Sequence, residues 1–311
     1  MRPRTTPFDG VGLGLRWELI DDILESKPKL AFLEISPENY MGRGGYYDEA
    51  LERARVVWPI VTHGLTMSLG GTDPLREHYL RDLRRFLERT KSPWHSDHLC
   101  FSTANGVVLH DLLPLALKRS EVVRIAERIK RAQDAIGVPM AVENVSFYLQ
   151  PGKGEMPEPE FVASVCEAAD CGLMFDVNNA WVNATNFNYD VDVWLRTIPL
   201  DRIVQMHVAG HDWFTDDGVF TIGERPANIR GGHGMLIVDT HGNDVADEVL
   251  AFLERTLERS GPRPVLLERD QSIPPLETLL AEVAKIDTIY RRATKARPHS
   301  AERSATFEEA R

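Results

Sequence analysis

The sequence has few cysteines, few positive charges and no long apolar segment. Of its 311 residues only Cys100, Cys166 and Cys171 are cysteines, and their spacing forms no Cys-x-x-Cys pair. This excludes a disulfide framework and makes a reducing, cytoplasmic location the expected one. The chain has 36 Lys and Arg residues against 47 Asp and Glu residues, a net charge of −11. It therefore lacks the basic surface that binding to nucleic acid or to an anionic membrane requires.

Membrane-spanning and secretory segments are also missing from the sequence. No apolar run approaches the roughly 20 residues that span a bilayer. The first seven residues include arginines but no apolar stretch of the kind that a signal peptide contains. Hydrophobic residues make up 43% of the chain and charged residues 27%, as in ordinary soluble proteins. We therefore expect a soluble protein that has neither a nucleic acid nor a membrane as its partner.

Short apolar runs alternate with helical patterns along the whole chain. In the segment Cys171–Asn179, the apolar residues 173–175 follow Gly172 and precede Asp176, which predicts a buried strand of a parallel sheet. The other predicted strands are Val11–Leu15, Leu30–Ile35, Pro59–Thr62, Trp94–Ser96, Pro139–Val142, Ile203–Met206 and Pro264–Leu267. The predicted helices are Trp17–Lys27, Asp48–Val56, Asp73–Thr90, Ser120–Ile136, Glu160–Ala169, Val191–Thr197, Ala246–Arg259 and Leu276–Arg291.

Eight strands that alternate with about eight helices predict a single-domain (β/α)8 barrel over residues 1–293. A doubly wound open sheet is the alternative. The pair Asp73–Pro74 predicts a helix start, because Asp caps helices and Pro fits their first turn. A polar, Asn-rich loop is expected after Asp176. The charged segment Thr294–Arg311 has no apolar stripe and is expected to be disordered.

Residues able to bind metal follow most of the predicted strands. The first polar residues after strands are Glu34, His63, His98, Glu143, Asp176, His207 and Glu268, and a glycine-rich insertion, Gly210–Asn243, adds Asp239 and His241. In a barrel these strand ends surround one mouth, so the side chains converge. One metal ion with an open position needs only three or four protein ligands. Eight or so candidates therefore suggest two or three ions that share bridging carboxylates.

Each of these residues also has a plainer interpretation. A lone His such as His63 is usually structural, Asp176 can cap a helix, and residues 239–241 can form a turn. The repetition at consecutive strand ends favours the metal site over these separate explanations. Further candidates, as additional ligands or as residues that orient ligands, are Asn178, Asn179, His211, Glu38 and Asn144.

These residues, in this order, resemble the multinuclear non-heme iron-dependent oxidative enzymes, the family that includes the methanobactin-biosynthesis oxidase. The segments that carry the resemblance are Pro37–Tyr40, His63–Gly64, Ser68–Gly70, Ser96–Leu99, Val142–Asn144, Asp176–Asn179, His207–His211, Asp239–Gly242 and Glu268–Asp270. The resemblance implies a (β/α)8 barrel that holds two or three irons. The residues that match the family's ligand motifs are His63, His98, Glu143, Asp176, His207, Asp239, His241 and Glu268.

The resemblance also implies an activity: oxidation with O2 of residues, often cysteines, in ribosomally made precursor peptides, with a separate protein that delivers the peptide. Asp97 stands where Glu is commoner in the family, and Phe175 where Leu is commoner. Two other functions stay open at this point. One is a divalent-metal isomerase or phosphoesterase on a similar barrel. The other is a metal-binding subunit without turnover of its own.

Overall fold

The computed structural model describes residues 6–215, 220–221 and 235–295. A closed barrel of eight parallel strands forms its centre, in the order β1, β13, β9, β8, β7, β4, β3, β2. The barrel strands are β1 (Val11–Gly14), β2 (Leu33–Ile35), β3 (Ile60–Gly64), β4 (His95–His98), β7 (Met140–Glu143), β8 (Gly172–Asp176), β9 (Ile203–Val208) and β13 (Val265–Leu267). The predicted (β/α)8 barrel is confirmed as a single domain, and the alternative of an open sheet is wrong.

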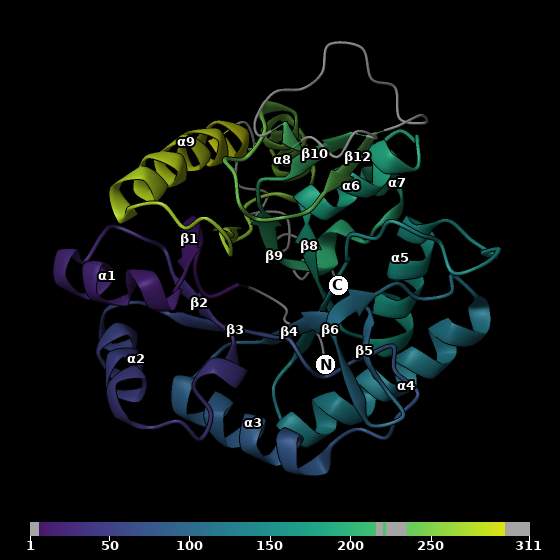
Figure 1. Cartoon of the computed structure of the whole chain (residues 1–311), viewed down its shortest axis with the longest axis horizontal. Helices are drawn as coiled ribbons and strands as arrows, with labels where there is room; N and C mark the ends of the chain where they lie inside the picture. Colours follow the sequence, from purple (N-terminus) through teal and green to yellow (C-terminus); the bar gives the residue numbers. More distant parts are fainter. Residues whose placement is uncertain (1–5, 216–219, 222–234, 296–311) are drawn as a thin grey trace, which may run out of the picture.

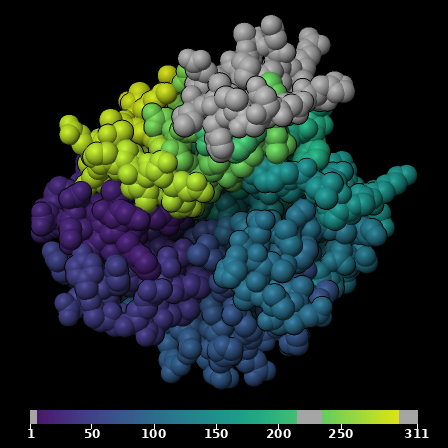
Figure 2. All heavy atoms as spheres, viewed as in Figure 1, coloured from purple at the N-terminus to yellow at the C-terminus, as the bar shows by residue number. Residues whose placement is uncertain are grey.

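Helices surround the barrel on the outside (Figure 1). They are α1 (Ile20–Ser26), α2 (Gly45–Val57), α3 (Glu77–Thr90), α4 (Arg119–Ile136), α5 (Glu158–Ala169), α6 (Val177–Asn186), α7 (Val193–Thr197), α8 (Asp247–Ser260) and α9 (Leu276–Lys295), with the short turns η1 (Trp17–Leu19), η2 (Pro37–Asn39) and η3 (Leu200–Arg202). In α3, for example, Leu80, Leu83 and Leu87 are buried, the spacing of one helix face. The last helix lies beside the first residues of the barrel (Figure 2), where α9 contacts β1.

Two local predictions are wrong. Helix α3 begins at Glu77 rather than at Asp73. The carboxylate of Asp73 instead accepts hydrogen bonds from the backbone N–H groups of Asn105 and Gly106, at 3.0 and 2.9 Å. Likewise, the expected loop after Asp176 is helix α6, because its asparagines are buried and hydrogen-bonded instead of forming turns. The Asn183 amide, for instance, accepts from Phe147 N–H and donates to Val145 C=O.

Two small sheets were not expected. Strands β5 (Phe101–Ala104) and β6 (Val107–Leu113) form a hairpin between β4 and α4. Within the glycine-rich insertion, β10 (Asp212–Thr215) pairs with β11 (Phe220–Thr221) and β12 (Met235–Val238). In the segment predicted to be a disordered tail, helix α9 includes residues 294 and 295, and residues 296–311 lie outside the described part of the chain.

The barrel interior has an apolar floor beneath a polar layer. The floor is a buried cluster of Phe32, Val61, Trp94, Ala141, Met174, Val204 and Leu266. On most strands the polar residue lies two positions further on, as Glu143 follows Ala141 and Glu268 follows Leu266, because alternate residues of a strand point the same way. Gly12 is required in this floor, since a Cβ there would lie 2.6 Å from the Phe32 ring. The strand pattern thus places the polar side chains together at one end of the barrel.

Candidate metal centre

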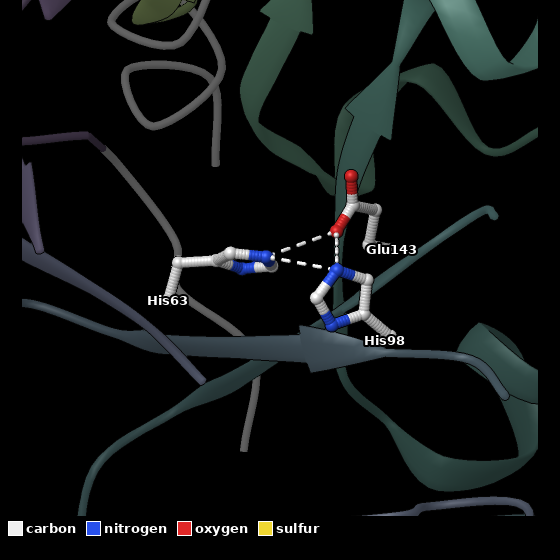
Figure 3. A group of neighbouring side chains, drawn as sticks. All are labelled: His63, His98 and Glu143. Carbon is white, nitrogen blue, oxygen red and sulfur yellow. Dashed lines mark hydrogen bonds and ion pairs between the residues drawn. The ribbon is translucent and has the colours of Figure 1, made fainter. Parts of the chain in front are cut away.

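Two histidines and one glutamate form the first of three adjoining groups of potential ligands. The Nε2 atoms of His63 and His98 lie 3.2 Å apart, and each lies 3.1 Å from Oε2 of Glu143. Figure 3 shows the three side chains pointing toward one another from separate strands. Ligand atoms about 2.1 Å from a common metal ion lie about 3.0 Å apart in octahedral and about 3.4 Å apart in tetrahedral coordination. The observed triangle falls between these values, so its size fits one ion.

Two buried polar atoms of this first group lack hydrogen-bond partners, whereas His63 Nδ1 lies 2.9 Å from the Ser96 hydroxyl. Glu143 Oε2 has no partner with hydrogen-bond geometry among the described residues, and neither has His98 Nδ1. Buried polar atoms are almost always hydrogen-bonded. Buried polar atoms without a partner, beside other potential ligand atoms, are what a cation-binding site provides.

In the first group, burial and the neighbouring charged groups shift the pKa values of His63 and Glu143 in opposite directions. Burial disfavours a charge on His63, but Glu143 beside it raises the pKa of His63 to about 9. Burial also raises the pKa of Glu143, and the opposite effect of His98 and His63 prevails, so its pKa is lowered. Burial is the main cause that lowers the pKa of His98. A metal ion would replace the proton that His63 holds here.

The second group gathers three carboxylates around one imidazole. Its members are Glu143, Asp176, His207 and Glu268, with potential ligand atoms all within 4.8 Å of one another. His207 Nδ1 lies 3.0 Å from Oε2 of Glu268 and 3.8 Å from Oε1 of Glu143. All four side chains are buried. Buried carboxylates this close repel one another unless a cation or a proton lies between them.

Asp176 serves two purposes. Its Oδ1 accepts a 2.6 Å hydrogen bond from the Asn179 N–H and so caps helix α6, while its buried Oδ2 has no partner among the described residues. Burial, followed by the charges of Glu143 and Asp239, raises the pKa of Asp176 well above its ordinary value. The capping and ligand interpretations of this residue are therefore compatible, one for each oxygen.

The third group lies at the rim and contains His241, Glu268 and Asp270. His241 Nδ1 is 3.1 Å from Oδ2 of Asp270 and 3.7 Å from Oε2 of Glu268, and its Nε2 is 2.9 Å from Oδ1 of Asp239. Both ring nitrogens therefore face carboxylates. Burial lowers the pKa of His241, but Asp239 and Glu268 together raise it well above its ordinary value. Glu268 belongs to the second and third groups, as Glu143 belongs to the first and second.

Asp239 and His241 lie outside the barrel in the glycine-rich insertion, as predicted, directly after the unexpected strand β12. Other segments hold them in place. Oδ1 of Asp239 accepts from the Asn178 amide at 2.7 Å, and Oδ2 accepts from the Ser146 hydroxyl at 3.3 Å. The Asp239 N–H donates to the hydroxyl of Tyr148 at 3.0 Å. The His241 N–H donates to Gly210 C=O, also at 3.0 Å. These contacts fix both residues despite their place in an insertion.

The five further candidates lie beside the three groups rather than in them. The Asn144 side-chain amide donates to Asp176 C=O and accepts from Asp176 N–H, and the Asn179 side-chain amide donates to Asn144 C=O. His211 Nδ1 lies 2.8 Å from Oδ1 of Asn178, whose amide holds Asp239. Glu38 lies apart and accepts hydrogen bonds from Leu65, Thr66 and Tyr79.

Two residues near the rim were missed by the strand-end reasoning. Asp270 lies two residues beyond Glu268 and joins the third group. Arg16 forms ion pairs with both, at 3.2 Å to Glu268 and 2.5 Å to Asp270. The segment Glu268–Asp270 carries part of the family resemblance, but only its first residue follows the strand directly. An Arg just past the first strand, in a mouth rich in carboxylates, was the available signal for Arg16.

The mouth of the barrel opens into a cavity of about 970 Å³ that the three groups reach. Ligand-type residues that line it include His63, His98 and His241. Hairpin residues form another part of the lining, and the loop after β7 contributes apolar side chains. These hairpin and loop residues are Thr103, Val108, His110, Asp111, Leu112, Leu113, Phe147, Tyr148 and Leu149. The cavity is thus polar where it reaches the groups and partly apolar along its walls.

The fold and the three groups define a (β/α)8 protein with a candidate multinuclear metal centre. The sequence profile described as RiPP precursor modification enzyme MbnB/TglH/ChrH matches residues 10–291, so the chain belongs to this family. By that description, its members modify precursors of ribosomally synthesised and post-translationally modified peptides. The resemblance noted in the sequence is therefore confirmed at the level of the family.

Relatives of similar length are known by sequence. A UPF0276 protein of Acinetobacter baylyi is 38% identical over 290 residues, which cover 93% of this chain and 94% of the relative. One from Nitrosospira multiformis is 40% identical over 280 residues, 90% of this chain and 92% of the relative.

Solved structures share the fold at low sequence identity. A xylose isomerase domain protein from Planctomyces limnophilus has a TM-score of 0.55 at 16% identity and covers 94% of this chain and 100% of its own. An L-ribulose 3-epimerase has a TM-score of 0.54 at 13% identity, with 96% of this chain and 99% of its own covered. These likenesses support the barrel fold alone.

The three cysteines, Cys100, Cys166 and Cys171, are all buried and form no disulfide. Burial raises the pKa of the Cys100 thiol well above its ordinary value, which keeps it in the unreactive protonated form. None of the described helices has the length and apolar character that crossing a bilayer requires.

Proposed function

We propose that this chain is a multinuclear non-heme iron oxidase that uses O2 to modify a residue, a cysteine in our view, of a precursor peptide. The observation that carries the proposal is the sharing of Glu143 and Glu268 among three adjoining ligand groups. A centre with one ion needs no shared carboxylate. Carboxylates that bridge ions a few ångströms apart are the usual construction of sites with several metals.

Each of the three groups would hold one ion. His63, His98 and Glu143 would hold one ion, and Asp176, His207 and Glu268 together with Glu143 a second. His241 would hold a third at the rim, either through Nδ1 with Glu268 and Asp270 or through Nε2 with Asp239. Bound iron would supply the capacity to exchange electrons with O2. The mixture of imidazole and carboxylate donors suits iron.

The cavity supports a peptide as the substrate. Its volume of about 970 Å³ lies at the upper end of the roughly 300–1,000 Å³ range of ligand pockets, more than one sugar requires. Its walls include the exposed hydrophobic side chains of Val108, Tyr148 and Leu149. A cysteine is the residue we favour, because a thiolate is a natural iron ligand.

Delivery of the peptide is expected to need help. The net charge of −11 repels an anionic peptide on approach. We therefore propose that a leader segment or a separate docking protein brings the substrate to the mouth. The isomerase or phosphoesterase alternative rests on fold likeness alone, and the non-catalytic subunit alternative predicts no turnover in any condition.

The test is co-incubation of the purified chain with a cysteine-containing precursor peptide encoded by a neighbouring gene, followed by mass spectrometry of the peptide. Protein loaded anaerobically with Fe2+ should change the peptide mass only when O2 is admitted. The same protein loaded with Zn2+ is the matched control and should leave the peptide unchanged. A reaction that proceeds equally with Zn2+ or without O2 would contradict the oxidase and favour Lewis-acid chemistry.

A further inference from the structure

We propose that Glu34 is a positioning residue that fixes His207 as an Nδ1 ligand, and that Gln205 and Trp94 hold Glu34 for this role. The proposal rests on the metal centre proposed above but not on which metal it holds. Glu34 lies on β2, directly in the barrel interior, and is not a member of any of the three groups.

The two nitrogens of His207 face different partners. Nδ1 points at the second group, 3.0 Å from Oε2 of Glu268. Nε2 lies on the other edge of the ring, 3.0 Å from Oε2 of Glu34. Both His207 and Glu34 are almost completely buried, so water does not compete for these contacts. The ring therefore separates the ligand group from a carboxylate behind it.

Trp94 fixes the orientation of the Gln205 amide. The indole Nε1–H can only donate, and it lies 3.3 Å from Oε1 of Gln205. The amide nitrogen of Gln205 must then point the other way, where it lies 2.6 Å from Oε2 of Glu34. Glu34 is consequently held by a donor whose own direction is set from the apolar floor, where Trp94 belongs.

The Gln205 nitrogen also lies 3.0 Å from Nε2 of His207, which leaves two arrangements of protons for a neutral imidazole. Gln205 can donate to an unprotonated Nε2, which leaves the imidazole proton on Nδ1. Alternatively, His207 carries its proton on Nε2 and donates to Glu34, alongside Gln205. A metal ion on Nδ1 permits only the second arrangement, because a neutral imidazole has one proton. Hydrogen bonds to a charged acceptor are also the stronger kind.

This arrangement gives His207 the carboxylate partner that metal-bound histidines usually have. Such a partner selects the tautomer, holds the ring and makes the ligand more basic, and its loss typically costs about 10–100-fold in metal affinity. The sequence places the parts by simple alternation: Gln205 and His207 are two residues apart on β9 and point the same way. Glu34 then meets both across the barrel.

The proposal is tested with Zn2+ alone, without O2 or peptide, so failure of the oxidase activity would not affect it. Zn2+ affinity is measured by chelator competition for the wild type and for Glu34→Gln, which keeps the size but removes the charge. We expect about 10–100-fold weaker binding at one site. Glu158→Gln is the matched control, a buried glutamate that accepts from Asn183 and Tyr189 away from the three groups. It should bind Zn2+ as the wild type does.

A second measurement needs no variant at position 34. Nitrogen-15 NMR of histidine-labelled, Zn2+-loaded wild type, with the His207 signals assigned by their loss in His207→Asn, reports which ring nitrogen carries the proton. Protonated Nε2 with Nδ1 on the metal is the expected result. A proton on Nδ1, or unchanged Zn2+ affinity in a folded Glu34→Gln protein, would overturn the proposal.

Discussion

Glu143 joins two of the three groups, so its replacement should remove more than one metal ion. In Glu143→Ala, each of the two inner sites loses a ligand and a negative charge. The loss of affinity should exceed the roughly hundredfold cost of losing even an indirect partner. At a free metal concentration about ten times the dissociation constant, a hundredfold loss lowers the occupancy of a site from about 90% to about 10%. The metal content should then fall from about 2.7 to about 1.1 ions per chain.

The fold should survive this change. Glu143 lies 3.1 Å from each of two histidines. Without this carboxylate, burial favours the neutral form of both imidazoles, which can lose their protons, so no uncompensated charge stays buried. Metal content is measured by mass spectrometry of the protein after dialysis against buffer at that free metal concentration, together with a chemical denaturation curve of the metal-free form. A decrease of about one ion's share would show that Glu143 serves a single ion. An unchanged metal content in a folded protein would remove Glu143 from the centre.

Four further predictions follow from particular contacts. His241→Ala should fold normally and keep the inner ions, but it should lose the rim ion and most O2-dependent turnover. Iron analysis and an activity assay measure these effects. Full activity with full metal content would show that this segment is only a lid. Burial raises the pKa of Glu158 to about 8 from its ordinary 4.5, so between these pH values this carboxyl is protonated in the folded chain and ionised in the unfolded chain. The free energy of unfolding should therefore fall by up to about 1.4 kcal/mol per pH unit as the pH rises from about 4.5 to about 8. Glu158→Gln should flatten this slope in denaturation curves, and an unchanged slope would refute the assignment. Gly12→Ala should lower the unfolding free energy by about 1–3 kcal/mol, since its Cβ meets the Phe32 ring, and a neutral effect would show that the floor can shift. A core peptide without its leader should be modified poorly by the isolated chain, as mass spectrometry would show, and efficient modification would remove the need for a docking aid.

The barrel was predictable because its strands repeat one pattern. A strand buried on both faces is a short apolar run. The sequence alternates eight predicted strands with helical segments. Alternation along each strand also placed the polar residues above the floor, which is why His63, His98, Glu143, Asp176, His207 and Glu268 meet as expected from the sequence. Whether they bind metal stays a prediction.

What could not be predicted depends on partners distant in the chain. Asp73 looks like a helix cap in the sequence, but two backbone N–H groups of the β5–β6 turn bind it instead. The asparagines of α6 look like turn formers until the loop after β7 supplies their hydrogen bonds. Glu34 ends a predicted strand, much as His63 follows one, yet it lies on the opposite side of the His207 ring from the second group. Which strand-end residues face the groups is determined only when the barrel closes.

We propose that the three adjoining groups hold iron through two shared carboxylates. The decisive measurement is anomalous diffraction at the iron absorption edge, from crystals of the anaerobically iron-loaded chain. We expect separate peaks within the groups around His63, His207 and His241, with Glu143 between the first two and Glu268 between the last two. A single peak, or peaks that neither glutamate bridges, would contradict it.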